Sequence, residues 1–225
     1  MDWQAFSLSL QLAGWTLVVL LPLGIVLART LATRRFRGRG MVEAVLALPL
    51  VLPPTVLGFY LLVTFGGDSM LGALYERLTG SSLVFTFEGL LLASVIFNLP
   101  FAVQPMQRAF ESIPVEVREA TKCCGLTGWR TLWRIELPLA WPGVLSALVL
   151  VFAHTLGEFG VVLMVGGNIA GETRTAAVAI YDRVQAFDDI GAGVMSAALL
   201  VFSIIAIAVA NRARPAIGWN HDRKR

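Results

Sequence analysis

The stretch "VEVREATKCCGLTGWRTLWRIELPLAWPG", Val115–Gly143, carries acids, bases and tryptophans, yet it lies between two long apolar runs of the sequence. The whole chain is 56% hydrophobic and only 15% charged, and its mean hydropathy is +0.73. Soluble domains of ordinary composition are less apolar than this. We therefore expect the quoted stretch to be a polar connection between membrane-spanning segments.

Five apolar runs are long enough to cross a bilayer, whose hydrocarbon core of about 30 Å needs about 20 helical residues. They lie at about residues 7–29, 41–65, 84–107, 138–165 and 192–211. The first run follows the acidic Asp2 and precedes a basic cluster, which is the reverse of a cleaved signal peptide, so we expect it to stay as a helix. We predict an all-α polytopic membrane protein with about five transmembrane helices in a single transmembrane domain, residues 1–225.

Basic residues are distributed unevenly among the connections between these runs. Fifteen of the eighteen Lys and Arg residues fall after the first run, after the third run or in the C-terminal tail. Because cytoplasmic loops carry such an excess, we expect the N-terminus outside and the C-terminus inside, with the quoted stretch in the cytoplasm. Topology accounts for the bases, so nucleic-acid binding is not expected. The adjacent Cys123 and Cys124 then lie in a reducing compartment, where neither a disulfide nor a metal framework is indicated.

The quoted stretch has the signals of two short helices joined by a turn. A helix start is indicated by Ser112 as the capping hydroxyl, by Pro114 in the first turn and by Glu116 as an acid near the positive end of the helix dipole. Gly125 is typical of a helix end and Thr127 of a second start. A loop held in the membrane at both ends is poorly placed to enter a DNA groove. Its many apolar side chains indicate a partner that covers them; the alternative is a solvated connector held by charge pairs.

The spacing of residues in this loop is similar to the signature of ABC importer permeases. That signature is Glu-Ala-Ala, three residues, Gly, nine residues, Ile, one residue, Leu-Pro, and it is matched by Glu119, Ala120, Thr121, Gly125, Ile135, Leu137 and Pro138. Only Thr121, where Ala is usual, departs from it. The resemblance implies the type I importer permease fold, with a cytoplasmic coupling loop at about residues 108–137 that docks on a separate ATPase subunit.

Three further stretches resemble molybdate ABC transporter permeases: "LPLVLPPTVLGFYLLV" (Leu48–Val63), "LGEFG" (Leu156–Gly160) and "GNIAGETRT" (Gly167–Thr175). The resemblance covers nearly the whole chain. It implies the permease of an ATP-driven molybdate importer in the cytoplasmic (inner) membrane of a prokaryote, with two permease copies, two ATP-binding subunits and an external binding protein. Permeases for sulfate and tungstate share the first of these elements, so tungstate, sulfate or another small solute stay open as cargo.

The chain has no Gly-x-x-x-x-Gly-Lys-Ser/Thr phosphate loop, so it is not expected to be its own motor. ATP and Mg²⁺ are expected on the partner ATPase, and we expect no catalytic residue, metal or cofactor in this chain. Five helices with one coupling loop supply half of a translocation path, which a two-fold homodimer would complete. An ion-driven carrier or a membrane enzyme is the alternative class, but the sequence has one membrane acid and no convincing internal repeat.

Pro49, Pro53 and Pro54 interrupt the second run, where proline removes backbone donors and leaves carbonyl groups free. This pattern fits either a packed kink or a pore-lining bend, in which a helix that begins at Thr55 offers its amides to a passing anion. Glu158 follows His154 by four residues, which predicts one shared helical face. A metal pair lacks further ligands, because the only other histidine is His221.

We expect Glu158 to have a structural role at the dimer axis or the outer gate, with helix or loop amides or Arg174 as its partner. The periplasmic loop at about residues 166–191 has apolar residues spaced like one helical face over Thr175–Phe187, and Arg174 is its anion-facing candidate. Glu119 forms either a surface ion pair or the contact that fixes the coupling helix against the second short helix. In the second case Gly125 allows the turn and Ala120 allows close approach.

Overall fold

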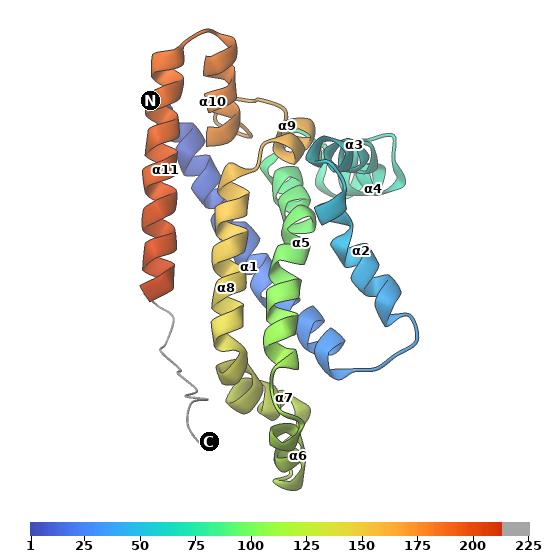
Figure 1. The fold of residues 1–225 in the computed structure, drawn as a ribbon. Coiled ribbons are helices and arrows are strands. Elements are labelled where there is room, and N and C mark those ends of the chain that lie inside the picture. Colours follow the sequence, from blue (N-terminus) through green and yellow to red (C-terminus); the bar gives the residue numbers. More distant parts are fainter. Residues whose placement is uncertain (213–225) are drawn as a thin grey trace.

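The computed structural model describes residues 1–212, with side chains described up to residue 208. Every regular element in this part of the chain is a helix (Figure 1). The helices are α1 (Trp3–Thr33), α2 (Arg39–Val51), α3 (Pro54–Phe65), α4 (Met70–Thr79), α5 (Phe87–Glu111), α6 (Val115–Cys123), α7 (Gly128–Thr131), the π-helical turn η1 (Leu132–Glu136), α8 (Leu137–Gly157), α9 (Gly160–Gly166), α10 (Ala176–Gln185) and α11 (Asp189–Arg212). The predicted all-α class is confirmed.

Four helical stretches are long and apolar enough to cross a membrane: Trp3–Thr33, Phe87–Glu111, Gly128–Gly157 and Asp189–Ala208. The second predicted crossing, residues 41–65, differs from a single kinked helix, because it consists of α2 and α3 bent by 112°. Leu52 and Pro53 are extended at the break, with ψ of 135° and 138°. Proline at positions 53 and 54 offers no backbone N–H, so the α2 hydrogen-bond ladder cannot continue through them. The described residues therefore contain four candidate spans, or five if the bent pair of α2 and α3 forms one broken span.

The core of the bundle lies where α1, α5 and α8 pack together (Figure 1). The largest fully buried side chains of this core are Met106 and Phe110 of α5, and they meet Ala28 of α1 and Val144 of α8. Small residues let these helices approach closely. A Cβ on Gly143 would lie 2.3 Å from the Cβ of Ala109, so α5 and α8 are in backbone contact at this level.

The fourth predicted crossing, residues 138–165, is also divided. Helix α8 ends at Gly157, Glu158 is extended with ψ of 127°, and α9 begins at Gly160. The prediction that His154 and Glu158 share one helical face is therefore wrong, because Glu158 has already left the helix. Helix α9 packs on α3, and a Cβ on Gly160 would lie 2.8 Å from the Cβ of Pro54. The two chain breaks thus lie against each other.

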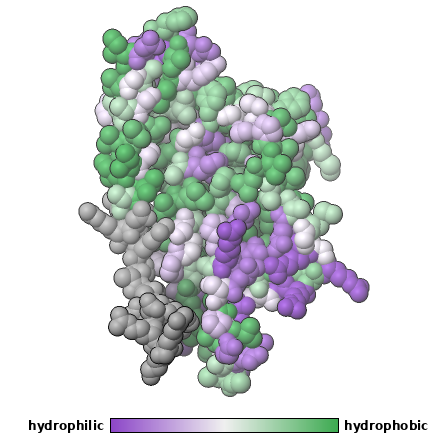
Figure 2. Space-filling view, in the orientation of Figure 1, coloured by the Kyte–Doolittle hydropathy of each residue, from purple (hydrophilic) through white to green (hydrophobic). Residues whose placement is uncertain are grey.

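Helices α6 and α7 lie at one end of the bundle and α10 at the other (Figure 1). The start of α1 lies at the α10 end, where Ala5, Ala179 and Met195 form a small buried cluster. Figure 2 shows a polar area over the connection between α1 and α2, whose exposed residues include Arg34, Arg35 and Arg37. The bases predicted after the first and third runs are therefore at the same end. The predicted basic tail beyond residue 212 and His221 lie outside the described residues.

Candidate functional site

The predicted coupling loop folds as α6, a turn, α7 and η1, and its helix ends follow local rules. Gly125 adopts a left-handed φ of +67° and ends α6. The Thr127 hydroxyl accepts a hydrogen bond from the Arg130 amide at 3.5 Å and caps α7. The capping role predicted for Ser112 is wrong: its Oγ donates to the Ala109 carbonyl at 2.8 Å, at the end of α5, while Pro114 is the N-cap of α6.

The residues of the predicted signature are gathered along one short structure at the α6 end of the bundle. Glu119, Ala120 and Pro138 are exposed, and Ile135 is half-buried. Thr121 is buried, and its hydroxyl donates to the Arg118 carbonyl at 2.7 Å. Between residues 1 and 212, no hydrogen bond or ion pair joins the Glu119 carboxylate to another side chain. Glu119 and Ala120 are therefore available to a partner.

A different acid, Glu136, attaches this structure to the bundle. Its Oε2 lies 2.6 Å from Nε of Arg29, and its Oε1 lies 3.7 Å from Nε of Arg118. Arg29 also donates to the Gly128 carbonyl at 2.9 Å, and Arg118 donates to the Phe110 carbonyl at 2.5 Å. Glu136 is only 3% exposed. Of the two alternatives expected for Glu119, an ion pair or a contact that fixes the coupling helix, neither is formed within residues 1–212, and it is Glu136 that joins α6 to α1.

Sequence reasoning missed Glu136, although a signal was present. It is the only acidic residue between Glu119 and Glu158, and it stands between the apolar Ile135 and Leu137. A charged side chain flanked by apolar residues at a helix start normally requires a partner when it is buried. The partner on α1, Arg29, is 107 residues away in the sequence, so spacing along the chain does not indicate it.

Three of the five predicted path residues line one pocket at the two chain breaks. An open pocket of about 500 Å³ contains Pro54 and Thr55 from the start of α3 and Glu158 from the break after α8. Pro53 is the N-cap of α3 and directly precedes them. His154 and Phe97 complete the wall of this pocket on the side of α8 and α5. Residues about 100 positions apart in the sequence therefore surround one cavity.

Glu158 is buried and has polar partners on α5. Its Oε2 accepts hydrogen bonds from Oγ of Ser94 and Nδ2 of Asn98, both at 3.4 Å. Ser94 in turn accepts from Oγ1 of Thr16 at 3.2 Å, and Oδ1 of Asn98 lies 3.0 Å from Nδ1 of His154. Oε1 of Glu158 has no hydrogen-bond partner within residues 1–212. The expectation of helix or loop amides or Arg174 as partners is wrong; the partners Ser94 and Asn98 were missed.

Arg174 is held by its own loop. Its Nε donates to Oδ1 of Asn168 at 2.6 Å and lies 3.7 Å from Oδ2 of Asp182. Asn168 donates to the same Asp182 oxygen at 2.6 Å. Because a carboxylate compensates its charge, Arg174 connects the outer loop to α10, and its role as an anion-facing residue gains no support from this geometry.

The predicted helix of the outer loop is α10, and its first half is buried through Ala176, Val178 and Ala179. The predicted single apolar face does not continue, because Val184 is 51% and Phe187 is 92% exposed. The turn after α10 is fastened by Asp188, whose Oδ1 accepts from the Gly191 amide at 2.9 Å and whose Oδ2 accepts from Arg183 at 2.6 Å. These bonds, that of Gly191 first, lower the pKa of the Asp188 carboxyl.

The sequence matches a protein family and a set of characterised relatives. Residues 21–217 match the family described as "Binding-protein-dependent transport system inner membrane component". The Molybdenum transport system permease protein ModB of Azotobacter vinelandii is 48% identical, over 92% of this chain and 91% of that protein. The protein of the same description from Escherichia coli (strain K12) is 38% identical, over 82% and 80%. A probable sulfate transport system permease protein, cysT of Chlorella vulgaris, is 30% identical, over 92% and 77%.

Solved structures of bacterial importers share the fold. A chain of the alginate ABC transporter in complex with an alginate pentasaccharide-bound periplasmic protein has a TM-score of 0.77 and 21% identity, over 93% of this chain and 76% of that one. A chain of the MetNI methionine ABC transporter in an inward facing conformation has a TM-score of 0.71 and 16% identity, over 96% and 94%. The resemblance read from the coupling-loop signature is confirmed. This chain belongs to the family of binding-protein-dependent transport system inner membrane components.

Proposed function

We propose that the chain is the permease subunit of an ATP-driven importer of molybdate. The observation that carries the proposal is the α6–η1 structure, which exposes Glu119 and Ala120 and is fixed rigidly to α1 and α8 through Glu136. An exposed structure that is anchored to the bundle in this way can transmit a force from another subunit to the membrane helices. The chain itself has no phosphate loop, so a separate ATPase is the source of that force.

The exposed surface of α6, α7 and η1 supports docking of a partner protein. Val115 is 62% exposed, Trp129 is 65% exposed and Trp133 is 51% exposed. The two tryptophan rings pack edge to face with centroids 5.5 Å apart. Large apolar side chains gathered at one exposed end of a molecule are typical of a protein interface. In this proposal α6 and α7 face the cytoplasm, the N-terminus lies outside and the C-terminus inside.

The assembly contains two copies of this chain, two ATP-binding subunits and an external binding protein that delivers the anion. The pocket formed by Pro54, Thr55 and Glu158 belongs to the translocation path or its outer gate. The buried hydrogen bonds of Glu158 to α5 hold the break after α8 in place, which is the structural role that we assign to this acid. Alternating access then moves the paired breaks of α2–α3 and α8–α9 together, because α3 and α9 are in contact.

Molybdate is favoured as the cargo because the relative of 48% identity is a molybdenum transport permease and the match extends over 92% of this chain. Sulfate is the second candidate, supported by the relative of 30% identity from Chlorella vulgaris. Both are tetrahedral dianions, and the external binding protein makes most of the distinction between them.

Reconstitution tests the class and the cargo together. The permease, its ATPase and its binding protein are placed in proteoliposomes, and uptake of molybdate and sulfate is measured with ATP, with ADP, or with an ion gradient alone. We expect molybdate uptake only with ATP and with the binding protein. Sulfate uptake at the higher rate would reassign the cargo. Uptake driven by the gradient alone would reject the importer class.

A further inference from the structure

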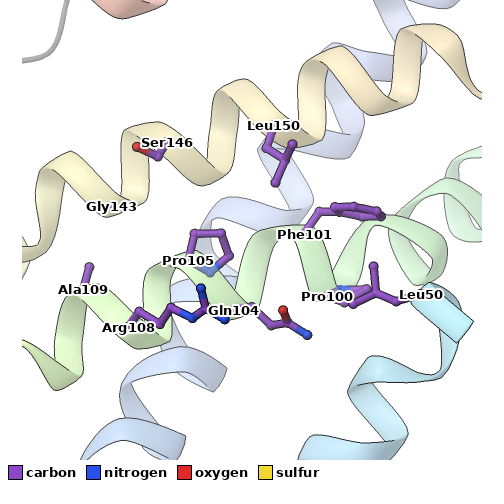
Figure 3. Close-up of a pocket in the computed structure, with 10 residues that line it drawn as sticks. All are labelled: Leu50, Pro100, Phe101, Gln104, Pro105, Arg108, Ala109, Gly143, Ser146 and Leu150. Carbon is purple, nitrogen blue, oxygen red and sulfur yellow. The ribbon is translucent and has the colours of Figure 1, made fainter.

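A second cavity, of about 600 Å³, lies between α2, α5 and α8 (Figure 3). It continues the line of the Glu158 pocket toward α6, because Phe101 lies about one turn after Phe97 on α5 and Leu150 lies about one turn before Ala153 on α8, which runs in the opposite direction. Its walls are mostly apolar, and polar groups come from Gln104, Arg108 and Ser146.

Gln104 and Arg108 are one helical turn apart on α5 and therefore share a face. Figure 3 shows the two side chains next to each other at the edge of the cavity. Gln104 is half-buried and Arg108 is exposed. Neither the Gln104 amide nor the Arg108 guanidinium forms a hydrogen bond or ion pair with another group in the described part of the chain. Within the described residues, the donors of Gln104 and Arg108 are therefore not used by a protein acceptor.

The acids near Arg108 are engaged by other residues. Glu43 and Glu111 line an adjoining pocket of about 330 Å³ together with Gln104 and Arg108. Oε1 of Glu43 accepts from Arg39 at 2.9 Å and from Gln107 at 2.9 Å. Oε1 of Glu111 accepts from the same two residues, at 2.8 Å and 3.0 Å. Both carboxylates therefore accept hydrogen bonds from Arg39 and Gln107, and in the described part of the chain neither is paired with Arg108.

We propose that Arg108 and Gln104 bind a tetrahedral oxyanion in this cavity, as a station between the Glu158 pocket and the α6 end of the bundle. A guanidinium presents parallel N–H groups that match two oxygens of such an anion, and the Gln104 amide adds two donors. The apolar walls reduce solvent screening of the attraction. The proposal rests on the proposed function insofar as the ligand is the transported anion; the phosphate of a lipid headgroup has the same chemistry.

A cysteine reporter tests the site in the assembled permease–ATPase complex. Leu50 lines the cavity without a polar role, so Leu50→Cys is introduced after the exposed Cys123 and Cys124 are replaced by Ser. The complex is kept in dodecyl maltoside, which contains no phosphate. The rate of Leu50→Cys alkylation by N-ethylmaleimide is then measured with molybdate, sulfate, phosphate or chloride at equal ionic strength. We expect the oxyanions, but not chloride, to slow the reaction.

Charge variants of the reporter protein identify the ligand-binding groups. Arg108→Gln is expected to raise the molybdate concentration for half-protection about tenfold, as for loss of one charged hydrogen bond. Arg108→Lys, which keeps the charge but loses the paired N–H geometry, should give an intermediate value. Glu111→Gln should lower that concentration, because it removes an acid from the adjoining pocket. Arg35→Gln is the matched control, since it removes one exposed positive charge outside the cavity and should change nothing.

Absence of protection both by every free oxyanion and by phosphatidylglycerol, or protection that is unchanged in both Arg108→Gln and Gln104→Leu, would overturn the proposal. If phosphatidylglycerol nanodiscs protect the reporter and free anions do not, the bound oxyanion is a headgroup phosphate. The proposed function fails separately, through absence of ATP-dependent molybdate uptake by the wild-type complex. Protection by sulfate or phosphate in such a protein would still support the site.

Discussion

Arg29 and Glu136 are 107 residues apart in the sequence, yet Nε of Arg29 lies 2.6 Å from Oε2 of Glu136. This ion pair fastens the last turns of α1 to the segment that leads from the coupling helices into α8. Arg118 of α6 approaches the other oxygen of the same carboxylate at 3.7 Å. A single buried acid thus links α6 to α1 directly before the start of α8.

Replacement of Glu136 by Gln should destabilise the folded permease. The side chain of Glu136 is only 4% exposed, and those of Arg29 and Arg118 are 27% and 21% exposed. Removal of the acid leaves two partly buried cations without a carboxylate, at a cost of about 2 kcal/mol, less than for a fully buried pair. The measurement is the midpoint of thermal unfolding in detergent. A midpoint equal to that of the wild type would contradict the anchoring role.

Replacement of Glu119 by Ala should leave the stability of the permease unchanged but impair its coupling to the ATPase. Because Glu119 is exposed and has no side-chain partner within residues 1–212, the variant should unfold at the wild-type midpoint and form the same assembly. Its ATP hydrolysis in proteoliposomes should nevertheless be uncoupled from molybdate uptake, since the contact that is lost belongs to the interface with the ATPase. Uptake per ATP that matches the wild type would remove Glu119 from the coupling contact.

Close approach at the two chain breaks gives a third prediction. A Cβ on Gly160 would lie 2.8 Å from the Cβ of Pro54 and 3.3 Å from the Thr55 amide nitrogen. Gly160→Ala must therefore separate α9 from α3, and overpacking of this kind costs about 1–3 kcal/mol. Gly157→Ala is the control, because a Cβ there meets no atom within 4 Å. Equal thermal midpoints for the two variants would show that the breaks are not tightly packed.

Local signals predicted the helix ends well, because backbone conformation near a turn depends on few residues. Gly125 ends α6 with a left-handed φ of +67°, and Thr127 caps α7 as expected. The prediction for Ser112 was wrong because a hydroxyl between two helices can bond to the end of the first or to the start of the second. The backbone conformation of the connection decides between them, and here Ser112 bonds to the end of α5. The apolar runs likewise predicted the positions of the long apolar helices, because the length of such a run is set by the bilayer, but they did not predict the breaks at Pro53 and Glu158.

The partners of buried polar groups could not be predicted from spacing along the chain. Glu158 is bonded to Ser94 and Asn98, which are 64 and 60 residues away. Ser94 and Asn98 are the two small polar residues of α5 and lie one turn apart, but the sequence does not show which group they face until α5 and α8 are packed together. The 112° bend between α2 and α3 likewise depends on how the helices pack in the folded chain. Proline predicts that the hydrogen-bond ladder of the helix stops. The direction of α3 follows instead from its packing on α9, in which Gly58 of α3 contacts α9 and Gly160 of α9 contacts α3.

The pocket at the start of α3 gives a fourth prediction. Thr55 lies at the first turn of this helix and lines the same cavity as Glu158. If the cavity is part of the anion path, Thr55→Val and Thr55→Leu should lower the maximal rate of molybdate uptake, with the larger residue having the larger effect. Binding of molybdate to the external protein should not change. Wild-type rates in both variants would mean that the bend is only a packed kink.

The turn after α10 should respond to acid through Asp188. Bonds from the Gly191 amide and Arg183 lower the pKa of this carboxyl below its ordinary value of 3.8. A group with a lowered folded-state pKa contributes stability that is present above the unfolded-state pKa and is lost as the pH falls through the folded-state pKa. At pH 7 the Gly191 amide should therefore exchange hydrogen more slowly in the wild type than in Asp188→Asn. That difference should shrink below a pH of about 4 and vanish once the wild-type carboxyl is protonated. A difference that is constant with pH would exclude the carboxylate as the source of protection.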